Sequence, residues 1–329
     1  MPEIIDANSH IITETVLDEL EKVHPSGEVS SLRNAPRMTA EAGRIDFLDR
    51  HGIDRQVINL VTGGVWHGAD PDACLDAVRL ANDEIRRLAD EYPDRFIPVG
   101  TLPFLTGEYV DEARRCVEDL DFHGIQVLSN VEGTLLDHED YEPFWATMDD
   151  LRVPVWIHPN LHRWHDFEEG ATWMYKMLGW PFDTSVAVAR LIFNGVLERH
   201  RNVELVTHHL GGTLPYLVGR VHSWYQTRRE EPELYANPVM ADLSEPLEAY
   251  FERIYGDAAV SSRGESYPLR CGYEFFGPEN VVFSADYPFG PDRGEYWTDT
   301  GIAAVENLDV PEAHKRKMFS ENAERMLGL

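Results

Sequence analysis

The feature that most constrains the fold of this chain is a regular alternation of short apolar runs with amphipathic helical patterns. Strands separated by helices in this way form parallel sheets, because a parallel crossover needs a long connection, usually a helix. We expect eight strands, at residues 3–10, 56–61, 95–102, 124–128, 153–159, 203–207, 253–258 and 281–286. This rhythm predicts an α/β fold, a (β/α)8 barrel of the TIM type.

The helical patterns support one continuous domain. No linker or low-complexity segment divides the 329 residues, so we expect residues 1–329 to form a single barrel domain. The segment 11–39 is broken by Pro25, Gly27 and Pro36 and is predicted to be a small N-terminal excursion after the first strand. The helical patterns cover 40–51, 71–91, 110–120, 142–151, 184–200, 213–229, 243–251 and, at the C-terminal end, 300–307 and 311–326.

Charge and cysteine content exclude several classes of partner. The chain has 58 acidic against 29 basic residues, a net charge of −29, which opposes binding to nucleic acid or anionic membranes. The acids are spread along the chain, and a surface of this kind suggests a high-salt cytoplasm that screens the self-repulsion. No apolar run approaches a membrane span, and the N-terminus does not resemble a signal peptide. Three widely spaced cysteines indicate reduced thiols in a cytoplasmic protein.

The sixth expected strand ends in His208 and His209, followed by Gly211 and Gly212. A histidine at the carboxyl end of a strand, beside a glycine turn that lets backbone approach a ligand, is typical of sites in α/β folds. A lone histidine there is more often a satisfied core residue. Other strand ends therefore decide between the two interpretations.

Those other strand ends carry compatible chemistry. Period-two alternation places Asn8 and His10 on one face of the first strand, His158 ends the fifth strand, and Asp286 ends the eighth. Taken one at a time, His10 could be a cap, His158 an ordinary strand terminus and Asp286 a turn former. Together at one barrel mouth, imidazoles and a carboxylate suit a divalent ion such as zinc with an open position for water or substrate.

With these residues in view, the chain resembles the metal-dependent amidohydrolase superfamily, in the branch that contains 2-amino-3-carboxymuconate-6-semialdehyde decarboxylase. The resemblance covers nearly the whole length. Its further motifs are Tyr-Pro-Asp-Arg-Phe at 92–96, Gly-Thr-Leu-Pro at 100–103, Arg-Cys-Val at 115–117, Gly-Ile-Gln-Val at 124–127, the segment 207–220 and Ala-Asp-Tyr-Pro-Phe at 285–289.

The resemblance implies roles for the strand-end residues. His10, His158 and Asp286 match metal ligands, with zinc the first choice and manganese the second, and Asp286 also belongs to the catalytic set. His209 matches the catalytic histidine because of its distance from the glycines and Pro215, so that His208 is expected to face the other way.

The resemblance also implies substrate-binding residues and a partner. Arg220 matches an arginine that reaches the active site of the partner subunit and holds a substrate carboxylate, which implies a homodimer. Phe289 and Trp173 match aromatic residues of the substrate pocket. The substrate arginine of the excursion is not matched, and Arg33 and Arg37 are candidates by location.

One position departs from the family pattern. The family's first strand carries His-x-His or Glu-x-His, where this chain has Asn8-Ser9-His10. A neutral amide oxygen is a poor zinc ligand, so metal binding could be weaker, the metal could be a different one, or no metal could bind.

Three further histidines, His67, His162 and His165, could enter the pocket. One further acid, Asp257, could orient a ligand or a substrate.

These features predict an enzyme, a nonoxidative decarboxylase of a small unsaturated or aromatic carboxylic acid. A metal-dependent hydrolase or hydratase on the same site is the alternative, although none of the four lysines lies at a predicted strand end to serve as a carboxylated ligand. A barrel that has lost catalysis and binds a ligand or partner is the alternative of another class, motivated by Asn8.

Overall fold

The computed structural model describes residues 3–35, 38, 41–61, 65–160, 174–234, 240–259 and 267–329. All pairings between the strands of the two larger sheets are parallel. These strands are β1 (Ile5–Asp6), β2 (His10–Ile11), β3 (Arg55–Leu60), β4 (Phe96–Pro98), β5 (Gly100–Leu102), β6 (Ile125–Leu128), β9 (Val155–His158), β10 (Leu205–Thr207), β11 (Ile254–Asp257) and β12 (Val281–Val282).

The strands pair in chain order. One sheet joins β1 and β2 to β3 and β3 to β4, and the other runs β5-β6-β9-β10-β11-β12. The first expected strand is thus split into β1 and β2, and the third into β4 and β5 at Val99. The two ends of this order also meet, because the Ala7 amide donates to the Phe283 carbonyl (2.9 Å) and the His10 amide to the Tyr287 carbonyl (2.8 Å).

Residues of both parallel sheets share a second apolar cluster. This second cluster is separate from the larger one between strands and helices, and the C-terminal helix contributes to it. Gly124 makes room for its bulkiest member, since a Cβ there would lie 2.4 Å from the Trp156 ring. The second cluster comprises Ile5, Ala7, Val57, Ile97, Val99, Trp156, Val206, Tyr255, Val282, Ala323, Met326 and Leu327.

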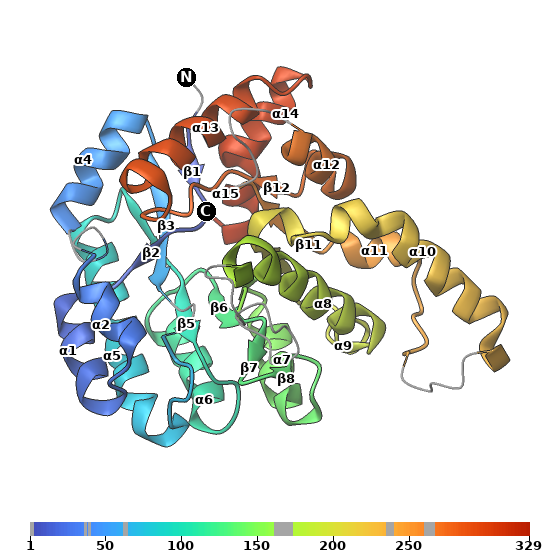
Figure 1. The fold of residues 1–329 in the computed structure, drawn as a ribbon, viewed down its shortest axis with the longest axis horizontal. Helices are drawn as coiled ribbons and strands as arrows, with labels where there is room; N and C mark the ends of the chain where they lie inside the picture. Colours follow the sequence, from blue (N-terminus) through green and yellow to red (C-terminus); the bar gives the residue numbers. More distant parts are fainter. Residues whose placement is uncertain are drawn as a thin grey trace.

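The helices lie around the strands, and α10 extends away from the rest of the chain (Figure 1). Their bounds are α1 (Glu14–Val23), α2 (Gly27–Arg33), α4 (Glu41–His51), α5 (Pro71–Glu91), α6 (Glu108–Arg114), α7 (Glu142–Leu151), α8 (Trp180–Phe193), α9 (Val196–Arg199), α10 (Leu214–Glu230), α11 (Leu247–Phe251), α12 (Tyr267–Phe276), α13 (Glu295–Glu306), α14 (Glu312–Arg316) and α15 (Asn322–Leu327). None of the helices in the described part of the chain has the length and apolar character needed to cross a membrane.

Four features differ from the sequence-based expectation. The excursion is not irregular, because Thr13 and Ser26 cap α1 and α2 with their side chains. The expected helix 184–200 breaks at Gly195, whose φ of 76° ends one helix before the next begins. Helix α12 and a small hairpin of β7 (Asn130–Val131) and β8 (Thr134–Leu135) were not expected.

Candidate active site

The polar side chains of the site come from the carboxyl ends of the strands. His10 lies on β2, His158 ends β9, His208 follows β10, Asp257 ends β11, and Asp286 follows β12. Parallel strands in chain order bring these ends to one mouth, as expected from the alternation of strands and helices. The structure therefore gathers residues that are almost 280 positions apart in sequence, since His10 Nε2 lies 3.3 Å from Asp286 Oδ1.

Three buried imidazoles form the centre of this site. The ring centroids of His10 and His158 are 5.1 Å apart, those of His158 and His208 are 5.1 Å apart, and those of His10 and His208 are 6.3 Å apart. All three side chains are at most 7 % exposed. In its neutral form each of these rings has one nitrogen with a lone pair that can bind a ligand.

The donor set fits a divalent metal ion. Neither ring nitrogen of His10 has a hydrogen-bond partner, although both are buried. The 3.3 Å between His10 Nε2 and Asp286 Oδ1 matches the spacing of two ligands, since donors each ~2.1 Å from one ion at a tetrahedral angle are ~3.4 Å apart. Across the described residues, no three such side chains already converge tightly enough to enclose an ion.

His158 is held in the tautomer that a metal ligand needs. Its Nδ1 lies 2.8 Å from the carbonyl oxygen of Pro159 and donates to it, so Nε2 keeps the lone pair. Burial, reinforced by the neighbouring His208 and His10, lowers the pKa of His158 well below its usual value. The neutral, ligating form of this imidazole is therefore present throughout the neutral pH range.

The expectation that His208 faces away from the site is wrong. His208 is 2 % exposed and lies beside His158 and His10, whereas His209 is partly buried and its ring is 6.0 Å from that of His208. The expectation assumed strand alternation through both histidines. The backbone instead turns left-handed at His209 and Leu210 (φ 55° and 53°), so adjacent side chains can serve the same mouth.

Asp257 organises the end of β10. Its Oδ2 accepts from His208 Nδ1 at 2.8 Å, and its Oδ1 accepts from the His209 amide at 2.8 Å. Burial favours the neutral acid, but the neighbouring His208 and these hydrogen bonds outweigh it and lower the pKa of Asp257. The carboxylate therefore fixes the ring of one histidine and the backbone of the other.

A second buried charged group supports the first strand. Arg44, which is 0 % exposed, donates to the His10 carbonyl, to Ser9 Oγ (3.0 Å) and to Gln56 Oε1 (3.0 Å). Its guanidinium also lies 4.8 Å from the ring centre of Tyr287, next to Asp286. One arginine thus fixes the backbone beside both members of the His10–Asp286 pair.

The substrate-binding residues suggested by the resemblance have different outcomes. The Phe289 ring is 5.6 Å from that of His10, at the site. Arg220 is exposed on α10 and lies 6.0 Å from the Trp224 ring, away from this chain's own imidazoles. Arg33 does not point to the site, because its guanidinium forms ion pairs with Glu14, Asp18 and Glu21 on α1. Four residues named from the sequence, Trp173, Arg37, His162 and His165, lie outside the described residues.

A small pocket next to His158 was missed by the sequence reasoning. It is lined by buried Trp66, Phe104 and Leu128, and His67 and Glu132 lie at its edge, 3.2 Å apart. Trp66 is 2 % exposed, and its indole nitrogen has no hydrogen-bond partner. Leu128 pairs with His158 across β6 and β9, so the pocket lies near the carboxyl ends of these strands, although none of the three central imidazoles lines it. Only the position of Trp66 after the second strand could have suggested it.

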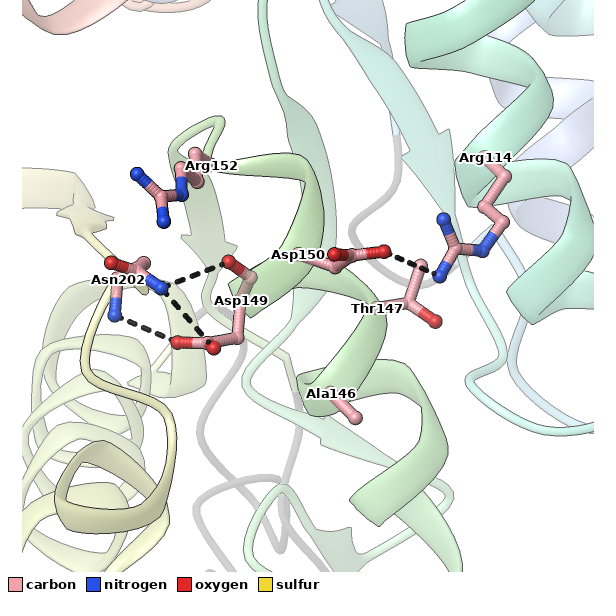
Figure 2. A pocket seen from close by; sticks show the side chains of 7 residues that line it. All are labelled: Arg114, Ala146, Thr147, Asp149, Asp150, Arg152 and Asn202. Carbon is pink, nitrogen blue, oxygen red and sulfur yellow. Dashed lines mark hydrogen bonds and ion pairs between the residues drawn. The ribbon is translucent and has the colours of Figure 1, made fainter.

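Another depression lies at the opposite end of the strands. Figure 2 shows its polar lining, in which Arg114 pairs with Asp150 (3.0 Å) and the backbone N–H of Asn202 donates to Asp149 Oδ1 (2.7 Å). Arg152 precedes β9 and Asn202 precedes β10. Active sites of parallel barrels lie at the carboxyl ends of the strands, so this hollow is not the active site.

Comparison with known proteins places the chain in a family. A family model described as Amidohydrolase matches residues 5–329, and the chain belongs to this family. The family predicted from the strand-end motifs is thereby confirmed.

The relatives are decarboxylases. The chain is 31% identical over 292 residues to 2-amino-3-carboxymuconate-6-semialdehyde decarboxylase of Dictyostelium discoideum, covering 87% of this chain and 76% of that protein. It is 26% identical to gamma-resorcylate decarboxylase of Rhizobium sp., covering 84% and 86%. In structure it is similar to dihydroxybenzoic acid decarboxylase of Polaromonas sp. with bound manganese and 2-nitroresorcinol (TM-score 0.79, 25% identity, 100% and 98% covered).

Proposed function

We propose that this enzyme is a metal-dependent, nonoxidative decarboxylase of a small aromatic or unsaturated carboxylic acid. The observation that carries the proposal is the buried group of His10, His158 and Asp286 at the strand ends, in a chain whose relatives are decarboxylases. Dihydroxybenzoic acids and carboxymuconate-type acids are the first substrates to test. Release of one CO2 per acid consumed supports the proposal, whereas hydrolysis or hydration of the same acids without CO2 contradicts it.

The reaction breaks the bond between the carboxyl carbon and the substrate carbon, and the electron pair stays on that carbon until a proton arrives. His10, His158 and Asp286 would hold a divalent ion, which when bound would supply positive charge next to the leaving carboxylate. His209 delivers the proton to carbon and regains one from solvent, so that each turnover consumes one proton. Burial lowers the pKa of His209.

The pocket of Trp66, Phe104 and Leu128 has a volume of about 10 Å³, which has room for one water-sized group and not for an aromatic ring, so in this proposal it receives a polar substituent of the ring. The unpartnered Trp66 N–H at this pocket suits a hydroxyl oxygen on the ring. A buried donor without a partner costs about 1–3 kcal/mol, which a substrate acceptor would recover.

Trp66→Phe is therefore expected to lower kcat/KM about tenfold for acids with a polar ring substituent, mainly through KM. The same acid without that substituent is the control and should change less than threefold. Equal losses for both acids would show that the indole N–H does not bind the substituent.

We further infer a homodimer through α8 and α10. These helices are joined by the Ser185–Thr213 hydroxyl contact (2.9 Å) and by the rings of Phe193 and Tyr225 (5.5 Å). Apolar side chains on and just before them are solvent-exposed in the single chain, and a second copy would cover them and receive Arg220. They are Met177, Leu178, Phe182, Val186, Tyr216 and Trp224.

The double variant Tyr216→Asp/Trp224→Asp is expected to sediment as a monomer and to lose activity, because Arg220 then has no partner site. Tyr296→Asp, an exposed tyrosine on α13, is the matched control and should stay dimeric. A wild-type chain that sediments as a monomer at micromolar concentration would contradict the dimer.

Several finer assignments belong to the same proposal. We take the two parallel sheets as one closed eight-stranded barrel and the chain as a single domain, supported by the hydrogen bonds between residues 7–10 and 283–287. Manganese and zinc both suit the donor set. The excess of acids and the unpaired cysteines Cys74, Cys116 and Cys271 favour a reducing, high-salt cytoplasm.

A further inference from the structure

We infer that His208, oriented by Asp257, is a metal ligand of this site and takes the role that Asn8 cannot fill. The inference rests on the proposed metal-dependent function and adds a ligand to it. The resulting donor set is His10, His158, His208 and Asp286.

The tautomer of His208 is defined by its partner. Asp257 Oδ2 lies 2.8 Å from His208 Nδ1, and a carboxylate only accepts hydrogen bonds, so Nδ1 carries the hydrogen. Nε2 then has the lone pair. This nitrogen is buried and has no hydrogen-bond partner, on a side chain that is 2 % exposed. Carboxylate–imidazole pairs of this kind commonly orient histidine ligands to metals.

Ring spacing supports a shared ion. The centroids of His208 and His158 are 5.1 Å apart, the same as those of His10 and His158. An imidazole centroid lies ~3.2 Å from a metal bound at Nε2, so two ligands at a tetrahedral angle have centroids ~5.2 Å apart. The 6.3 Å between His10 and His208 corresponds to an angle of ~160° at the same ion, so these two rings would lie on nearly opposite sides of it.

The side chain of Asn8 is directed at protein groups instead of the metal. Its side-chain nitrogen lies 3.2 Å from His208 Nδ1, and its side-chain oxygen accepts from Asn59 Nδ2 at 2.8 Å. Both ends of this buried amide therefore face protein groups. In this inference His208, which follows β10, supplies the imidazole that the first strand lacks at position 8.

The test measures metal affinity separately from catalysis. Manganese and zinc dissociation constants would be determined by competition with a chelator for wild type, His208→Gln, Asp257→Asn and His209→Gln. We expect His208→Gln to weaken binding at least 100-fold and Asp257→Asn about 10- to 100-fold. The adjacent His209→Gln is the matched control and should stay within threefold. The double variant Asn8→His/His208→Gln should regain at least tenfold over His208→Gln.

A measurement on the unaltered enzyme covers the case in which a variant does not fold. Pulsed electron paramagnetic resonance of the manganese-loaded wild type should count three imidazole nitrogens on the ion. Two nitrogens, or His208→Gln binding within threefold of wild type, would overturn the inference while leaving CO2 release, and so the proposed function, intact. A wild type that releases CO2 but binds neither metal would overturn the metal dependence itself.

Discussion

Asp286→Ala is expected to abolish CO2 release, with a fall in kcat/KM of at least about 1000-fold and near-complete loss of bound metal. Among the described residues, Asp286 is the only acid that forms an ion pair with His10, with 3.3 Å between Asp286 Oδ1 and His10 Nε2. Loss of its charge leaves neutral imidazoles to hold a divalent ion. A metal that stabilises the charge of the reaction contributes several kcal/mol, which corresponds to a rate factor of roughly a thousand.

Metal content per chain and CO2 release would be measured together for this variant. Asp292→Ala removes an exposed acid of the same loop and should retain both. In the wild type, chelator treatment should reproduce the loss, and added manganese or zinc should reverse it. Full metal content in Asp286→Ala would exclude this residue from the ligand set.

His209→Ala is the second change with a large expected effect, a fall in kcat of about 10²–10⁴ with the metal retained. Positioned acid–base groups contribute this much to proton transfer. Burial lowers the pKa of His209, so its neutral form persists below the usual imidazole range. Because His209 must be protonated to deliver the proton, we expect kcat/KM to fall as pH rises through this lowered pKa, at a pH below about 6.5, and this alkaline limb to disappear in the variant.

Added imidazole should partly restore the activity of His209→Ala, because it can enter the space left by the side chain. His138→Ala, at an exposed histidine, is the control and should keep full activity. Activity of His209→Ala within tenfold of wild type, or an unchanged alkaline limb, would show that another group transfers the proton.

Much of the fold and part of the site follow from sequence alone. Period-two alternation and strand-end positions were enough to select Asn8, His10, His158 and Asp286, because parallel strands must place their carboxyl ends together. The capped helices α1 and α2 carry Thr13 and Ser26, a local signal that was present in the sequence but obscured by Pro25, Gly27 and Pro36.

The sequence by itself determined the parallel α/β fold, the family and the mouth at which the chemistry lies. Only the tertiary structure decided which of the two adjacent histidines joins His10 and His158. That choice depends on a left-handed turn at His209 and on Asp257, a carboxylate 49 positions away from His208 that holds its ring. The physical reason is that strand periodicity is local and readable in sequence, whereas a backbone reversal and a long-range hydrogen bond depend on which strands become neighbours.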